Sequence, residues 1–263
     1  MKIFLITDIH YGENTNYPKH GGLEYINQFG ELFKNFFPHL REEMEACDLV
    51  MNLGDFIHDE STEKDIETFK SALSFFLLKT PVRHVFGNHD AKNISREQWS
   101  QLVGEENSYY SFDLGGYHHI VLDGNRTEPR GPLYIPEEQL KWLEGDLDKT
   151  SLTTVVYSHF PMDNQSMDSN YYFKDKPENA SLGNKYFVRR ILEKSGKVVA
   201  VFSGHTHFYN EQSLGGITYW TVPSFSENDG NNQPNGKYAI VTLTGNQARI
   251  EIKVSAGREG GKK

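Results

Sequence analysis

The chain has 263 residues and one cysteine, and its 27 Lys and Arg residues against 36 Asp and Glu residues give a formal net charge of −9. A chain of this length buries enough surface for a large core, and the single cysteine excludes an intrachain disulfide and a cysteine-based zinc site. The acidic balance argues against a long nucleic acid as partner, but not against a small phosphate ester, because bound metal reverses the charge locally.

The first third of the chain alternates apolar runs with helical patterns. The strands predicted here cover residues 2–7, 48–53 and 82–86. Apolar residues at three- and four-residue spacing predict a helix over 23–44, which Pro38 kinks or splits. The same spacing predicts a second helix over 66–77, begun by Ser61 or Thr62. This βαβαβ order predicts a parallel sheet with helices on both faces.

The remainder of the chain is a mixture of strands and helices. Residues 109–114 and 118–123 flank a Gly-Gly pair, which predicts an antiparallel hairpin. The later predicted elements are a helix from Pro136 to Leu147, a strand over 152–158, a helix over 185–194, and strands over 198–203, 217–222, 238–244 and 248–254. We expect residues 1–256 to form one domain and the glycine-rich tail 257–263 to be disordered.

The N-terminal apolar run ends before Asp8, which makes it shorter than the apolar stretch of a secretory signal. No run approaches the ~18 apolar residues of a membrane span. We therefore expect a cytoplasmic protein without a membrane partner, and its oligomeric state stays open.

Five of the predicted strands are followed at once by side chains that bind metals. These side chains are Asp8 and His10, Asp55, Asn88, His159, and the pair His205 and His207. Ligands in a parallel α/β sheet bind just past the carboxyl ends of the strands, so residues far apart in sequence are expected to converge on one edge. Glycines before Asp55, Asn88 and His205 would allow an abrupt exit from each strand and a close backbone approach.

The set contains two carboxylates, one amide and four imidazoles, which is too many ligands for one ion. It suits two ions that share one carboxylate. Nitrogen and oxygen ligands without sulfur favour Mn, Fe, Zn, Co or Ni over Ca or Mg. Two such ions about 3.5–4 Å apart clamp a phosphoryl group and provide hydroxide at neutral pH.

These blocks resemble the signature of the calcineurin-like metallophosphoesterase superfamily. The matching motifs are Asp8-x-His10, Gly54-Asp55, Gly87-Asn88-His89-Asp90, His159 and Gly204-His205-x-His207. The resemblance implies an α/β fold, a four-layer α/β/β/α sandwich of two mixed sheets flanked by helices. The block spacings and the chain length are most similar to those of the bacterial cyclic-nucleotide phosphodiesterase branch.

The resemblance also assigns roles by matching position. One metal would be held by Asp8, His10, Asp55 and His207, and the other by Asp55, Asn88, His159 and His205, with Asp55 bridging. His89 would contact the scissile phosphate beside Asn88 and protonate the leaving oxygen, while Asp59 and Asp90 would lie behind the ligands.

One position departs from the family pattern. Many members carry an acid three residues after the bridging aspartate, where it orients the catalytic histidine, and this chain has His58 there. Either Asp59 takes over that task or His89 is oriented in another way. His58 itself either reaches the substrate or faces solvent.

The expected reaction is in-line attack of a metal-bridging hydroxide on a small phosphodiester or nucleotide. The alternatives are a phosphomonoesterase or phosphoprotein phosphatase, a DNA nuclease, which the acidic charge disfavours, and a non-catalytic scaffold, which the intact ligand set disfavours. The partner would be a small-molecule phosphate ester. Its contacts would come from residues 163–184, with Tyr171, Tyr172 and Phe173, and from Arg126 and Arg130; the alternative is packing on the body for these aromatics and solvation for the arginines.

Overall fold

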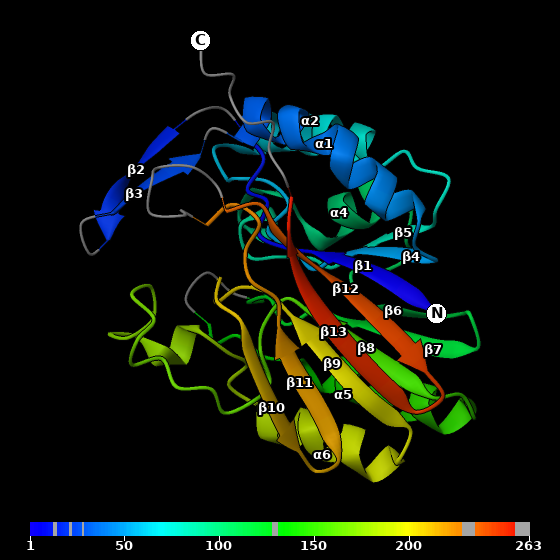
Figure 1. The fold of residues 1–263 in the computed structure, drawn as a ribbon. Helices are drawn as coiled ribbons and strands as arrows, with labels where there is room; N and C mark the ends of the chain where they lie inside the picture. The colour runs from blue at the N-terminus through cyan, green and yellow to red at the C-terminus, as the bar shows by residue number, and fades with distance from the viewer. Residues whose placement is uncertain (13–14, 21–22, 28, 128–130, 228–234, 256–263) are drawn as a thin grey trace.

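The computed structural model describes residues 1–12, 15–20, 23–27, 29–127, 131–227 and 235–255. Two β-sheets pack face to face with helices on the outer face of each, which gives four layers (Figure 1). This is the α/β/β/α sandwich that the family resemblance implies. The strands predicted over 2–7, 48–53 and 82–86 run parallel as expected, but helices cover only one face of their sheet, because the second sheet packs on the other face. The predicted tail 257–263 lies outside the described residues.

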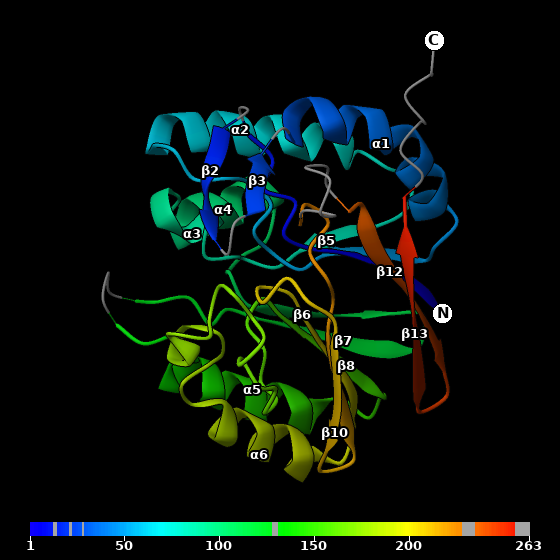
Figure 2. The same ribbon diagram turned by 60° about the vertical axis from the view of Figure 1, so that its left-hand side comes forward.

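The first sheet has the strand order β13-β12-β1-β4-β5, and β1, β4 and β5 run parallel. Its strands are β1 (Lys2–Ile6), β4 (Leu49–Asn52), β5 (Val82–His84), β12 (Lys237–Thr244) and β13 (Gln247–Val254). Helices α1 (Phe29–Glu45) and α2 (Thr62–Phe75) lie over its outer face (Figure 2), and α3 (Asp90–Asn93) and α4 (Arg96–Val103) follow β5.

The second sheet has the order β10-β11-β9-β8-β7-β6. Its strands are β6 (Tyr110–Leu114), β7 (Tyr117–Leu122), β8 (Thr154–Ser158), β9 (Val198–Ser203), β10 (Asn210–Leu214) and β11 (Ile217–Thr221). Helices α5 (Glu137–Lys149) and α6 (Lys185–Ser195) cover its outer face, and a 3-10 turn, η1 (Pro177–Asn179), precedes α6. Strands β7, β8, β9 and β11 run parallel to one another. At the two edges of the sheet, β6 pairs antiparallel with β7 and β10 pairs antiparallel with β11.

The two faces of the second sheet bury different cores, as the alternation of side chains along a strand requires. On β8, Val155 and Tyr157 point toward the first sheet and join the large core between the sheets. Val156 points the other way and packs with Leu143 of α5 and Val188 of α6. Both faces of this sheet are therefore buried against apolar side chains.

The helix predicted over residues 23–44 is wrong in its first part. Residues Leu23–Asn27 form β3, which pairs antiparallel with β2 (Thr15–His20), and helix α1 begins only at Phe29. Pro38 lies inside this single helix. The short apolar run at 23–27 fits the helical spacing by coincidence, because a strand of five residues is too short for its period to be distinguished.

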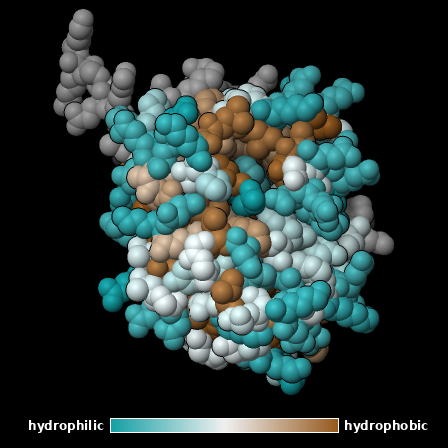
Figure 3. Space-filling model, turned by 90° about the vertical axis from the view of Figure 1, so that its right-hand side faces the viewer, coloured by the Kyte–Doolittle hydropathy of each residue, from teal (hydrophilic) through white to brown (hydrophobic). Residues whose placement is uncertain are grey.

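Figure 3 shows the face on which β1 begins, with brown apolar residues gathered in its upper half and teal polar residues around them. In the described part of the chain, no helix combines the length and apolarity that crossing a bilayer requires. The carboxyl ends of the parallel strands lie at the opposite end of the sheets, where the candidate site is built.

A buried histidine far from those strand ends couples stability to pH. The His118 ring is 6% exposed and lies between Asp113 Oδ1 at 2.6 Å and Asp146 Oδ2 at 2.8 Å. Burial lowers the pKa of His118, but the two carboxylates outweigh it and raise the pKa above 6.5. Because the folded-state pKa exceeds the unfolded value, this stabilisation is complete below pH ~6.5 and is lost as pH rises through the folded pKa.

We expect His118→Gln to lower the free energy of unfolding by about 2 kcal/mol at pH 6 and by less at pH 9. Urea unfolding of both proteins across this range measures the difference. A difference that stays constant with pH would contradict a charged His118 in the folded state.

Candidate metal centre

The carboxyl ends of strands from both sheets meet at one edge, and all seven predicted ligand positions gather there. Asp8 and His10 follow β1, Asp55 follows β4, Asn88 follows β5, His159 follows β8, and His205 and His207 follow β9. The described residues contain three groups of side chains within which the ring nitrogens and carboxylate oxygens lie within 4.8 Å of one another. Two of these groups together contain six of the seven predicted ligands. The seventh, Asn88, places its Oδ1 3.1 Å from His159 Nε2.

The backbone at these positions is unusual. Five non-glycine residues in the described chain have φ between +49° and +68°, and each is a predicted ligand: Asp8, His10, Asp55, His205 and His207. Residues other than glycine rarely adopt this left-handed backbone region, because it is strained for them. The strain persists only where the surrounding structure fixes the conformation. The turn at each strand end therefore aims the side chains at one point at a cost in backbone energy, a combination that points to function.

Two glycines let the ligand-bearing segments touch. A Cβ atom on Gly87 would lie 2.0 Å from the Asp55 backbone nitrogen, and one on Gly204 would lie 2.0 Å from Thr7 Oγ1. No other residue fits at either position without moving the backbone or the threonine. The close approach expected from the glycines is thus present, and it brings the ends of β4 and β5 and of β1 and β9 together.

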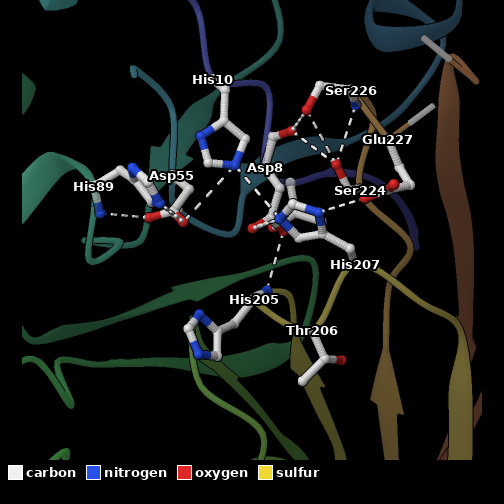
Figure 4. Close-up of polar contacts among 12 residues, drawn as sticks. Asp8, His10, Asp55, His89, His205, Thr206, His207, Ser224, Ser226 and Glu227 are labelled. Atoms are coloured by element: carbon white, nitrogen blue, oxygen red, sulfur yellow. Dashed lines mark hydrogen bonds and ion pairs between the residues drawn. The ribbon is translucent and has the colours of Figure 1, made fainter. Parts of the chain in front are cut away.

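The first ligand group consists of Asp8, His10 and His207 (Figure 4). His10 Nε2 lies 3.5 Å from His207 Nε2, and His207 Nε2 lies 3.4 Å from Asp8 Oδ1. Asp8 is fully buried, and its Oδ1 accepts no hydrogen bond from the part of the chain that the structure describes. A buried carboxylate oxygen without a hydrogen bond, with two imidazole nitrogens turned toward it, is the arrangement expected of ligands to a bound cation.

The second group consists of Asp55, His159 and His205. Asp55 Oδ2 lies 3.3 Å from His159 Nε2 and 4.0 Å from His10 Nε2 of the first group. The same carboxylate oxygen therefore faces both groups, which is the position that a bridging ligand needs. The donor set fits two ions that share Asp55.

The electrostatics of the centre favour positive charge. Burial lowers the pKa of His207, but Asp8 and Glu227 outweigh it and raise the pKa to about 10. Burial likewise lowers the pKa of His159, while Asp55 and Asp8 raise it to about 9. The carboxylates thus draw protons onto buried imidazoles, and divalent ions at the same positions would replace those protons.

A third group, His10, His58 and His89, also meets the distance condition. It contains no carboxylate, and His89 Nδ1 is already bonded to Asp59. Three imidazoles without an anion compensate a cation poorly, so we assign His10 to the group with Asp8. His58 is 6% exposed, and its ring centroid lies 5.3 Å from that of His89, so it does not face solvent.

Three of the candidate ligands are oriented through their second ring nitrogen. His159 Nδ1 donates to the Leu53 carbonyl at 2.9 Å, and His205 Nε2 donates to the Asn179 carbonyl at 2.8 Å. His207 Nδ1 lies 2.7 Å from Glu227 Oε2. The hydrogen-bond network assigns the proton to these atoms and leaves the opposite nitrogen free to bind a metal.

Glu227 is a residue that the sequence analysis missed. It is 4% exposed, and Tyr172 donates to its Oε2 at 2.8 Å while Tyr171 donates to its Oε1. It lies in an irregular segment 20 residues beyond His207, outside every motif, so no spacing signal marks it. Tyr171 and Tyr172 therefore pack against the protein, as the alternative interpretation has it, and they hold the carboxylate that orients the candidate ligand His207.

We expect Glu227→Gln to weaken metal binding about 10- to 100-fold, because the amide no longer supports His207 as a carboxylate does. Isothermal titration of metal-stripped protein with Mn²⁺ measures the change. Glu178→Gln, at an exposed acid of η1, is the matched control and should bind as the wild type does. Equal affinity of the Glu227 variant and the wild type would show that the contact does not support the metal.

The structure decides between the two orientations considered for His89. Its Nδ1 is hydrogen-bonded to Asp59 Oδ1, and Asp59 also pairs with Lys92. The His89 backbone nitrogen donates to Asp55 Oδ1 at 2.8 Å, and its Nε2 lies 4.0 Å from Asp55 Oδ2. Asp59, one residue later than in the family pattern, thus holds the ring with Nε2 toward the metal groups.

Asp90 supports the backbone of two ligand-bearing segments. Its Oδ1 accepts from the nitrogens of Phe56 and Ile57 at 3.0 and 3.1 Å, and its Oδ2 accepts from Gly87 at 3.0 Å. It therefore ties the segment after β4 to the segment after β5, behind the ligands as expected.

The two ligand groups open into a cavity of about 280 Å³. Its lining residues are Asp55, Asn88, His89, Arg126, Leu133, Phe160, Tyr172, Phe173, Asn179, His205 and His207. Of the residues proposed for substrate contact, Asn88, His89, Arg126, Tyr172 and Phe173 line it, whereas His58 and Tyr171 do not. Arg130 lies outside the described residues.

Comparison with known proteins agrees with this geometry. A sequence profile of the calcineurin-like phosphoesterases matches residues 1–209. The chain is 26% identical over 224 residues to acid phosphatase type 7 of Mus musculus, covering 78% of this chain and 50% of that protein. It is 25% identical over 183 residues to purple acid phosphatase 22 of Arabidopsis thaliana, covering 62% of this chain and 38% of that protein. The chain thus spans half or less of these relatives.

Solved structures share the fold. A dimetal phosphatase from Danio rerio matches with a TM-score of 0.71 at 16% identity, over 97% of this chain and 99% of that chain. GAP50, the anchor in the inner membrane complex of Plasmodium, matches with a TM-score of 0.62 at 12% identity, over 99% and 86%. Since the sequence profile spans all five motif blocks, the chain belongs to the calcineurin-like phosphoesterase family.

Proposed function

We propose that this protein is a dinuclear-metal phosphohydrolase that cleaves a small phosphodiester. The observation that carries the proposal is the cavity wall, which combines Asp55, His205 and His207 from the two ligand groups with His89. When bound, two metal ions would neutralise phosphoryl oxygens and activate a water molecule for in-line attack. The remaining steps fall to side chains of the chain itself.

His89 is the general acid of this proposal. Burial lowers its pKa, but Asp55 and Asp59 raise it above 6.5, which favours the protonated ring. With Nδ1 held by Asp59, the proton at Nε2 is the one available to a leaving oxygen in the cavity.

Asn88 has two roles in this proposal, as a metal ligand and as a hydrogen-bond donor to the substrate. Its Oδ1 faces His159 Nε2, so its Nδ2 remains as a donor on a residue that lines the cavity. We propose that this amide hydrogen-bonds to a phosphoryl oxygen and fixes the orientation of the ester.

The shape of the site favours a diester. A second, larger hollow adjoins the cavity and shares Asn88, Arg126 and Leu133 with it. A phosphoryl group over the ligand groups would therefore have room for a substituent toward this hollow and for another toward Tyr172 and Phe173. The sequence resemblance to cyclic-nucleotide phosphodiesterases agrees with such a substrate and remains a prediction.

A phosphomonoesterase is the second candidate, because the curated relatives at 25–26% identity are named acid phosphatases. A phosphoprotein phosphatase would be a variant of this reading. A non-catalytic scaffold is the third candidate; the Plasmodium anchor with this fold makes it worth testing, and the complete ligand set weighs against it.

Metal-stripped protein reconstituted with Mn²⁺, Fe²⁺, Co²⁺, Ni²⁺ or Zn²⁺ should hydrolyse bis-p-nitrophenyl phosphate faster than p-nitrophenyl phosphate. Cyclic and linear nucleotides would then be screened with the best metal. Preference for the monoester would select the second candidate. Two bound metals without turnover of either ester would favour the scaffold.

A further inference from the structure

The hollow beside the metal-facing cavity measures about 820 Å³. Among the described residues that line it, Lys92, Arg96 and Arg126 are cationic and Glu97 is acidic. It runs along α3 and the start of α4, and Arg126 belongs to both hollows. A group bound to Arg126 would thus lie beside the phosphoryl site.

Two of the three cations are already paired with acids. Lys92 Nζ is bonded to Asp59, and Arg96 Nε lies 2.6 Å from Asp123 Oδ2. Arg126 differs, because Nε donates to the Gly131 carbonyl at 2.6 Å and Nη2 donates to Asn179 Oδ1 at 2.6 Å. Both partners are neutral, and no carboxylate pairs with Arg126 anywhere in the described ranges.

These two bonds fix the guanidinium without neutralising it. An arginine has five N–H donors, and the two bonds leave three for another acceptor. Asn179 also links Arg126 to the candidate metal centre, since its backbone carbonyl accepts from His205 Nε2. The guanidinium is therefore charged, held in one orientation and separated from the candidate metal ligand His205 only by Asn179. Such a group suits a phosphate, which arginine binds through paired hydrogen bonds.

We propose that Arg126 binds a second phosphate of the substrate, so that the enzyme prefers small esters carrying another phosphate near the scissile one. The inference rests on the proposed function, because it assigns the scissile phosphoryl group to the metal side of the cavity. Arg126 then determines specificity through substrate binding, and it has no part in the proton transfer.

Matched probes isolate the second phosphate. We would compare p-nitrophenyl esters of thymidine 5′-monophosphate, thymidine 5′-diphosphate and thymidine 3′,5′-bisphosphate with the metal-reconstituted protein. The KM of at least one ester with two phosphates should be about 10- to 100-fold below that of the monophosphate ester. Arg126→Gln should abolish this difference, and Arg126→Lys should restore part of it; both variants should keep the metal content of the wild type.

Arg189→Gln is the control, because this arginine also donates to an asparagine, Asn164, but lines neither hollow. Calorimetric binding of thymidine 3′,5′-bisphosphate, thymidine 5′-diphosphate and thymidine 5′-monophosphate gives a readout without turnover. The proposal is overturned if the wild type binds all three equally, or if Arg126→Gln weakens all three by the same factor. Binding that follows the prediction without hydrolysis of any ester would overturn the proposed function and keep the subsite.

Discussion

Asp55→Asn is expected to reduce metal content from two ions to less than one per chain and kcat/KM by about 10³-fold or more. Asp55 Oδ2 is the oxygen that faces both ligand groups, at 3.3 Å from His159 Nε2 and 4.0 Å from His10 Nε2. In the variant, an NH2 group replaces one carboxylate oxygen, which removes the negative charge that the two ions would share.

The substitution is a clean test because asparagine suits the backbone at this position. Asp55 has φ of 49°, and asparagine tolerates the left-handed region better than most residues do. The variant should therefore fold, which circular dichroism and the thermal midpoint would check. Asp148→Asn, at an exposed acid of α5, is the control. A variant that retained both metals and its rate would show that Asp55 does not bridge.

His89→Ala is expected to lower kcat/KM about 10²- to 10⁴-fold on esters with poor leaving groups and to keep both metals. The reason is that His89 Nε2 would supply the proton to the leaving oxygen, while Asp59 occupies Nδ1. Esters of acidic phenols need little protonation, so their hydrolysis should fall least. A series of phenyl esters of graded leaving-group pKa measures this dependence.

Metal analysis separates this role from ligation. Because His10, His58 and His89 also form a compact nitrogen group, His89 could instead be a ligand. Loss of one metal from His89→Ala, or an equal rate loss across the ester series, would contradict the acid role. Asp59→Asn should reproduce a smaller part of the leaving-group effect, since it only orients the ring.

The strand ends were the most predictable part of this molecule. A short apolar run followed at once by Asp, Asn or His recurs after β1, β4, β5, β8 and β9, and those positions converge in space. Parallel strands place their carboxyl ends at one edge, so the sequence pattern alone predicts the convergence. The left-handed backbone at Asp8 and His205 sets the direction of these side chains, and it cannot be predicted from the residue type.

Other features depend on tertiary contacts and were not predictable. Glu227 acquires its role only because residues 163–184 fold back over the His205–His207 turn and bury it with Tyr171 and Tyr172. The choice between Asp59 and another partner for His89 likewise required the path of the loop after β4. Helix α4 was missed although Ser95 and Gln98 form a capping box that the sequence displays.

Two metal ions that share Asp55 at the junction of the two sheets should be visible by anomalous diffraction from crystals grown with Mn²⁺. We predict two peaks about 3.5–4 Å apart, one beside Asp8, His10 and His207 and one beside Asn88, His159 and His205, with Asp55 between them. A single peak, or a peak held by His10, His58 and His89 without Asp55, would contradict a shared Asp55.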